Sequence, residues 1–171
     1  MRLVIDLTGL QSGSRFRGIG RYARGLAAGL LRTAGQHEVW LAVSENPSGT
    51  AEAIRADFGD LAPPHRIVTY RTLDGGPYPR SSVYWRRARE LTREHFFAGL
   101  QADAILFTSL FEGFEGDVIT SGGGLCGESL RAVIAHDLIP LRNPEKYLDA
   151  PEVRGWYYDK LAAFCDCDLF L

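Results

Sequence analysis

The sequence predicts an α/β domain in which an open, mainly parallel, Rossmann-like sheet carries helices on both faces. Apolar runs of strand length alternate along the chain with segments of helical period, which is typical of βαβ units. The apolar runs are unbroken, as expected for strands that are buried on both faces. With 171 residues, of which 46% are hydrophobic, the chain is long enough to bury one substantial core.

Each strand is expected where an apolar run is bounded by turn residues, at 3–7, 39–43, 66–70, 104–108, 131–136 and 168–171, with a short extra strand at 118–120. Val4 and Ile5 should be fully buried in the central strand. Helical periodicity predicts helices at 19–31, 51–58, 82–100 and 157–164. The first helix should present one apolar face made of Tyr22, Leu26, Gly29 and Leu30. Two glycines and two prolines make residues 73–79 a loop.

Composition excludes several classes of protein. A net charge of -2, with no basic face beyond one helix, argues against a nucleic-acid partner. The sequence contains no apolar segment long enough to span a membrane and no secretory signal, and its odd number of cysteines fits a reducing, cytoplasmic location. No metal site and no cofactor are expected. Neither the cysteines nor the histidines have metal-ligand spacing; they are Cys126, Cys165, Cys167, His37, His65 and His95.

The segment from Gly18 to Ala23 matches the dinucleotide fingerprint G-x-G-x-x-A. In that fingerprint the glycines follow the first strand directly, whereas eleven residues separate Gly18 from Asp6 here. The preceding polar loop, which contains Arg15 and Arg17, instead leads to a helix N-terminus, where free amides favour a phosphate group. An NAD(P)-binding oxidoreductase domain stays open as an alternative, since Glu45 ends the second strand. A flexible loop without ligand is the other alternative.

Four stretches in this order carry a resemblance to a known family: Phe16–Tyr22, Thr108–Phe114, Ala135–Leu141 and Pro144–Leu148. Together they look like the N-terminal domain of the retaining GT-B glycosyltransferases (group 1 family), and most closely the branch of O-antigen mannosyltransferases. The resemblance covers the whole chain, residues 1–171. It implies the acceptor-side half of a two-domain enzyme whose C-terminal, donor-binding domain is absent from this chain. The sequence ends on an apolar run and lacks the spaced glutamate pair usual in that second domain, which fits this expectation.

The resemblance also implies the site residues and partners. Gly18, Gly20 and Arg17 match the loop that approaches the donor diphosphate, and His136 with Asp137 matches the catalytic position that faces the donor sugar. The acceptor would be bound by Arg15, Ser109 and Glu112. The partners would be a nucleotide-sugar donor, which supplies a hexose such as mannose, and a glycan or lipid-linked acceptor in polysaccharide synthesis. A histidine at the carboxyl end of a strand suits hydrogen bonding to a sugar.

Residues 84–97 combine four arginines with four aromatic side chains on one predicted helix. Such a helix can lie on anionic lipid, which would make the protein peripheral to the inner face of the membrane. It can equally be an amphipathic helix that packs on the sheet with arginine–glutamate pairs on its exposed face. A non-catalytic binding module is a further alternative for the whole chain.

Overall fold

The computed structural model describes residues 1–136 and 138–171 and confirms the predicted fold class. Six strands form one open sheet in which every neighbouring pair is parallel, in the order β3-β2-β1-β4-β5-β6. The strands are β1 (Arg2–Asp6), β2 (Glu38–Ser44), β3 (Ile67–Tyr70), β4 (Ala104–Phe107), β5 (Leu130–Val133) and β6 (Leu169–Phe170). The order reverses between β1 and β4, which creates the topological switch point at which open α/β sheets bind ligands.

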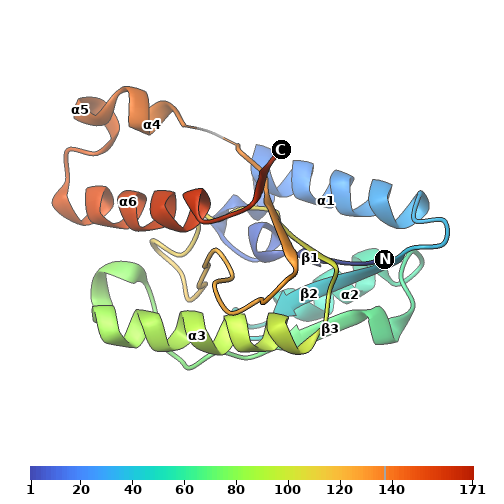
Figure 1. Cartoon of the computed structure of the whole chain (residues 1–171). Helices are drawn as coiled ribbons and strands as arrows, with labels where there is room; N and C mark the ends of the chain where they lie inside the picture. The colour runs from blue at the N-terminus through green and yellow to red at the C-terminus, as the bar shows by residue number, and fades with distance from the viewer. Residues whose placement is uncertain (137) are drawn as a thin grey trace.

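Helices cover both faces of this sheet (Figure 1). They are α1 (Gly18–Arg32), α2 (Thr50–Phe58), α3 (Val83–Gly99), α4 (Ile139–Arg142), α5 (Pro144–Tyr147) and α6 (Pro151–Cys165). Four 3-10 turns lie in the connections: η1 (Thr8–Leu10), η2 (Gly13–Phe16), η3 (Pro64–Arg66) and η4 (Tyr78–Arg80). Figure 1 shows the short helices α4 and α5 standing away from the sheet, beyond the beginning of α6.

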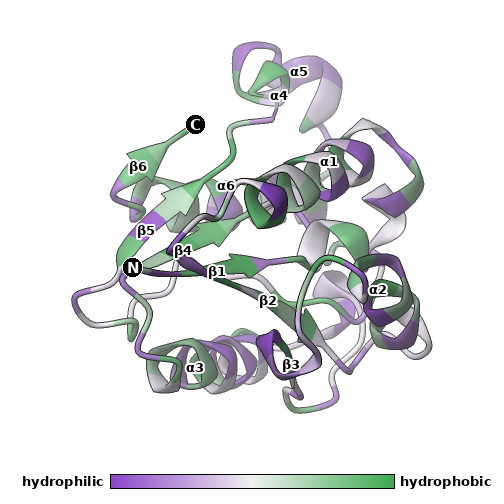
Figure 2. Ribbon diagram, turned by 90° about the vertical axis from the view of Figure 1, so that its right-hand side faces the viewer, coloured by the Kyte–Doolittle hydropathy of each residue, from purple (hydrophilic) through white to green (hydrophobic). Residues whose placement is uncertain are grey.

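Two hydrophobic cores lie on opposite faces of the sheet. Ile5 and Leu41 pack with residues of α1 and α2, and Val4 packs with Phe97 of α3 and Phe164 of α6. Val4 and Ile5 both have 0% exposure, as the sequence predicted for the central strand. Figure 2 shows the hydrophobic residues concentrated along β1, β4 and β5.

Several predicted elements differ from the structure. Residues 118–120 are buried but form no strand, because the carbonyl group of Thr120 accepts a hydrogen bond from Lys160 of α6 rather than from a neighbouring strand. The helix expected at 157–164 already begins at Pro151, and the last strand comprises only Leu169 and Phe170. The short helices α4 and α5 were not expected, since four residues are too few to show a helical period.

The predicted apolar face of the first helix was only partly right, since Leu26 and Leu30 pack against the core but are not its buried residues. The buried residues of α1 are Gly20, Ala23 and Ala27, whereas Tyr22 is 52% exposed and Leu30 is only half-buried. Small side chains let the helix axis approach the sheet closely, so the small face takes the contact. Counting large apolar residues at helical spacing misses such a contact.

The helix α3 differs from a simple amphipathic helix, because it turns charged residues toward the sheet. Arg89, Arg93 and Glu94 are buried in the middle turns of the helix, and Arg93 is fully enclosed. They are tolerated there because the two arginines pair with carboxylates, Arg93 with Asp6 and Arg89 with Asp117. No helix in the described part of the chain is both long and apolar enough to cross a membrane.

Candidate functional site

The segments that follow β1, β4 and β5 meet at the carboxyl edge of the sheet, around the switch point. Thr108, which follows β4, ties two of them together: its Oγ1 donates to the carbonyl group of Asp6 at 2.7 Å. Its own carbonyl group lies 2.6 Å from Nε2 of His136, which follows β5. Three consecutive strands of the sheet are thus linked by hydrogen bonds through one threonine.

His136 lies at this edge, half-buried, with its ring edge-on to Tyr22 of α1 at a centroid distance of 5.5 Å. A carbonyl oxygen can only accept, so Nε2 of His136 must carry the proton that it shares with Thr108. In the neutral ring Nδ1 is then the acceptor, and among the described residues it has no hydrogen-bond partner. Asp137, the second residue predicted for catalysis, lies outside the described residues.

The glycine turn is close by, at the beginning of α1. Arg17 precedes the helix, and no side chain in the described segments caps its N-terminus. Gly18 is exposed, with open space around the position of a Cβ atom among the described residues. Gly20 is different: it is buried, and a Cβ atom there would overlap the backbone of Arg15. Close packing of η2 on α1 is therefore sufficient to explain the glycine at 20, while Gly18 leaves its amide accessible.

Ser109 and Glu112 form a buried pair beside this turn. Ser109 Oγ donates to one carboxylate oxygen of Glu112 at 2.9 Å, and Ser14 Oγ donates to the other at 3.2 Å. Burial raises the pKa of Glu112, although the hydrogen bonds from the neighbouring serines oppose this shift. The structure thus brings Ser109 and Glu112 together, whereas Arg15 is exposed, with its guanidinium group 4.5 Å from the ring centroid of Phe16.

A fully buried ion pair at the end of β1 supports this edge of the sheet, and it was not predicted from the sequence. Arg93 of α3 donates to Asp6 at 3.0 Å, and both side chains have 0% exposure. Asp6 also accepts from Thr8 Oγ1 at 2.7 Å, and Arg93 donates to the carbonyl and hydroxyl oxygens of Ser121. The sequence signal was an aspartate that ends an otherwise apolar strand, a position where burial requires a cationic partner.

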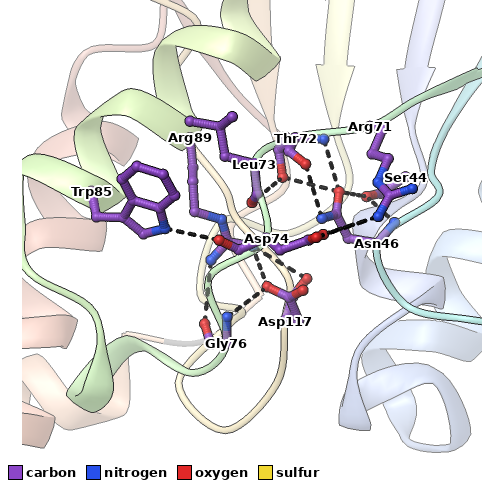
Figure 3. Close-up of polar contacts among 10 residues, drawn as sticks. All are labelled: Ser44, Asn46, Arg71, Thr72, Leu73, Asp74, Gly76, Trp85, Arg89 and Asp117. Atoms are coloured by element: carbon purple, nitrogen blue, oxygen red, sulfur yellow. Dashed lines mark hydrogen bonds and ion pairs between the residues drawn. The ribbon is translucent and has the colours of Figure 1, made fainter.

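A second polar network fixes the loop after β3 (Figure 3). The side-chain oxygen of Asn46 accepts from the amide and hydroxyl groups of Thr72, and its amide nitrogen donates to the Thr72 carbonyl. Farther along this loop, the amide of Gly76 donates to Asp117, which lies between β4 and β5, at 3.0 Å. Asp117 also pairs with Arg89 of α3. This loop is therefore tied to the end of β2 on one side and to α3 on the other.

Within the described residues no group of three or more histidine, cysteine or acidic side chains is arranged to hold a metal ion. The polar groups at the edge are a histidine, a buried carboxylate, hydroxyl groups and the free amides of a helix N-terminus. Such groups can bind and orient a polar ligand such as a sugar or a phosphate ester.

Comparison with known proteins gives one consistent result. The chain is 28% identical, over 166 residues, to a serotype-specific mannosyltransferase WbdA of Escherichia coli, which covers 96% of this chain and 20% of that protein. Two further proteins of the same name and organism are 25% and 27% identical over 141 and 142 residues, which is 81% of this chain and 17% of each relative. No family model matches the chain. No solved structure matches it.

The chain therefore spans about a fifth of the length of the curated relatives it matches. These similarities support a relationship to the glycosyltransferases. The match to the first relative extends over nearly the whole chain, so it includes both the glycine turn and the segment around His136.

Proposed function

We propose that this chain is the acceptor-side, N-terminal domain of a retaining GT-B glycosyltransferase. In this proposal the enzyme moves a hexose, which the names of its relatives suggest is mannose, from a nucleotide sugar to a glycan or lipid-linked acceptor in polysaccharide synthesis. The observation that carries the proposal is the similarity to mannosyltransferases over 96% of the chain. The doubly wound sheet and the polar groups gathered at its switch point agree with it.

The proposed roles follow from the surroundings of each residue. The accessible amide of Gly18, together with Arg17, would stabilise the negative charge of the donor diphosphate as it leaves. Nδ1 of His136 would accept a hydrogen bond from a hydroxyl group of the transferring sugar, and Asp137 would be the second catalytic residue. Ser109 and Glu112 would orient the acceptor through the polar edge that they form, and Arg15 would contact its exposed part. Catalysis would rest on positioning and electrostatic stabilisation.

The oxidoreductase alternative is not favoured. All three relatives are named mannosyltransferases. In the structure the segment between β1 and α1 contains two 3-10 turns, η1 and η2, so the glycines do not form the direct strand-to-helix turn that holds a dinucleotide pyrophosphate. Calorimetric titration with NAD should therefore show no binding, and micromolar binding that is lost in Gly18→Ala would reinstate this alternative.

A cytoplasmic location belongs to the same proposal, and so does peripheral contact with anionic lipid. The surface for that contact is smaller than the whole segment 84–97. Phe97 and two of the four arginines are buried. Trp85 donates from its indole nitrogen to the carbonyl group of Asp74 at 2.8 Å (Figure 3). The most exposed large apolar side chains of α3 are Tyr84, which is 89% exposed, and Val83, and these two would meet a bilayer. Tyr84→Ser should therefore weaken cosedimentation with anionic vesicles, and unchanged cosedimentation would contradict this contact.

The decisive test distinguishes the structural role of Nε2 of His136 from the proposed catalytic role of Nδ1. The protein expressed from the complete reading frame is incubated with a nucleotide-activated mannose and a mannose-terminated oligosaccharide, and addition of one hexose is followed by mass spectrometry. His136→Gln keeps a donor for Thr108 but removes the acceptor at Nδ1, so it should fold normally and lose roughly 100- to 1000-fold in turnover. His95→Gln, at an exposed position, serves as the control. Full activity in His136→Gln would show that the histidine only holds the Thr108 segment.

A further inference from the structure

A small polar pocket lies between α3, α6 and the segment after β4, next to the candidate site. Tyr78 and Gly113 are half-buried at its mouth, and Ser81, Arg89 and Lys160 are buried deeper in its wall. Glu112, whose carboxylate accepts from Ser109 and Ser14, also lines it. The pocket therefore lies next to the proposed acceptor residues, and no role has yet been proposed for the pocket itself.

Buried polar atoms in this pocket lack partners. Ser81 is 8% exposed, and neither its hydroxyl oxygen nor Nε of Arg89 has a hydrogen-bond partner among the described residues. Lys160 is 3% exposed, and its ammonium group donates to the carbonyl of Thr120 at 2.7 Å, while its nearest carboxylate, Glu90, is 4.0 Å away. An ammonium group has three hydrogens, so Lys160 has donors to spare. Buried polar groups of this kind usually meet a ligand or an ordered water.

The charges in the wall decide what kind of ligand fits. Arg89 pairs with Asp117, Lys160 faces Glu90, and the third cation, Arg86, lies 3.8 Å from an aspartate of α6. Each cation thus has its own carboxylate, and the pocket lacks the surplus positive charge that a phosphate group needs. A neutral hydroxyl group fits better, because it can accept from a cation or from Ser81 and donate to a carboxylate.

Aromatic side chains beside the pocket favour a sugar over other alcohols. The indole nitrogen of Trp156, one helical turn before Lys160 on α6, donates to the carbonyl group of Glu112 at 3.3 Å. The ring of Phe114 lies against Trp156 with a centroid distance of 5.4 Å. Both rings are half-buried, so an apolar surface stands next to a polar pocket. A pyranose ring, which has apolar C–H faces and polar hydroxyl groups, matches this pair of surfaces.

We infer that this pocket is a carbohydrate subsite that receives one hydroxyl group of the acceptor sugar, with Lys160 and Ser81 as its contacts and Trp156 beneath the sugar ring. The inference rests on the proposed function for the identity of the ligand as the acceptor. It makes the pocket a determinant of acceptor specificity.

The test uses the fact that Lys146 and Lys160 are the only lysines in the chain. The chain is isotopically labelled at its lysine side chains and titrated with methyl α-mannoside while both signals are followed by NMR. The Lys160 signal should shift with a saturable dependence in the millimolar range and the signal of Lys146, which is exposed, should not. Ser81→Ala should weaken binding about tenfold, and Ser48→Ala, at an exposed serine, should not.

Two outcomes of the titration overturn the inference. A Lys160 shift with inorganic phosphate but not with the mannoside would make the pocket an anion site, and no shift with either would leave it a site for water. Transfer assays on the protein from the complete reading frame separate this inference from the proposed function. If the wild type transfers mannose but Lys160→Met, compared with Lys146→Met, leaves the acceptor KM unchanged, only the subsite fails. If the mannoside binds but no nucleotide sugar supports transfer, only the proposed function fails.

Discussion

The ion pair between Asp6 and Arg93 is expected to dominate the stability of this domain. Both side chains are fully buried, 3.0 Å apart, and Arg93 makes further hydrogen bonds to Ser121. Arg93→Met keeps most of the side-chain volume but leaves the carboxylate of Asp6 buried without its partner, which typically costs 3 to 5 kcal/mol, so we expect a loss of about 4 kcal/mol. For a domain of this size that loss lowers the melting temperature by roughly 8 to 16 °C.

Urea denaturation followed by circular dichroism measures this loss as a shift of the midpoint at constant slope. Arg71→Met is the control, because Arg71 pairs with Asp74 where both side chains are exposed, and this pair should contribute less than about 1 kcal/mol. Adding Asp6→Asn to Arg93→Met removes the unpaired charge and should restore part of the stability. A loss below about 1 kcal/mol in Arg93→Met, or losses that simply add in the double variant, would refute this reasoning.

Three further substitutions or measurements have defined expectations. Burial lowers the pKa of Lys160 to about 8, so between pH 8 and 10.5 the unfolded chain binds more protons and the free energy of unfolding should rise with pH. Relative to Lys160→Met, the wild type should gain roughly 3 kcal/mol over that range in urea titrations; parallel curves would contradict the burial of a charged amine. Gly20→Ala should lower the melting temperature by several degrees because of its overlap with Arg15, whereas Gly18→Ala should not; equal effects would place the 3-10 turn elsewhere. Cys165 should react with a thiol reagent at pH 8 well before the two buried cysteines, whose pKa burial raises to about 11, and three equally fast reactions would contradict their burial.

The sheet was predictable because its central strands are buried on both faces. Unbroken apolar runs such as the one around Val4 and Ile5 are a strong local signal, and their alternation with helices leaves few topologies. The helix faces were not predictable from periodicity. On α1 the contact residues are small, and on α3 they include Arg93, whose burial depends on a carboxylate 87 positions away in the sequence. No local pattern reports such a partner.

The candidate site was predictable in its positions more than in its contacts. The carboxyl ends of parallel strands meet at one edge, so His136 and Ser109 could be assigned to that edge from the strand assignments alone. The hydrogen bond that fixes the His136 ring could not, because it ends on a main-chain carbonyl that every residue offers. The Lys160 pocket was not predicted for a related reason. Lys160 lies on a helix whose predicted start was six residues too late, and the other residues that line the pocket come from three separate segments.

The contacts at the switch point connect the stability of the core to the geometry of the site. Arg93 holds the side chain of Asp6, the carbonyl group of Asp6 accepts from Thr108, and the carbonyl group of Thr108 holds the ring of His136. The orientation of the histidine therefore depends on a charge pair buried beneath the sheet edge. A site that relies on positioning rather than on a strong nucleophile needs such rigid support. Apolar residues would also pack at this position, but they would not hold Asp6. The buried ion pair does so, and it thereby fixes the end of β1 relative to the end of β4.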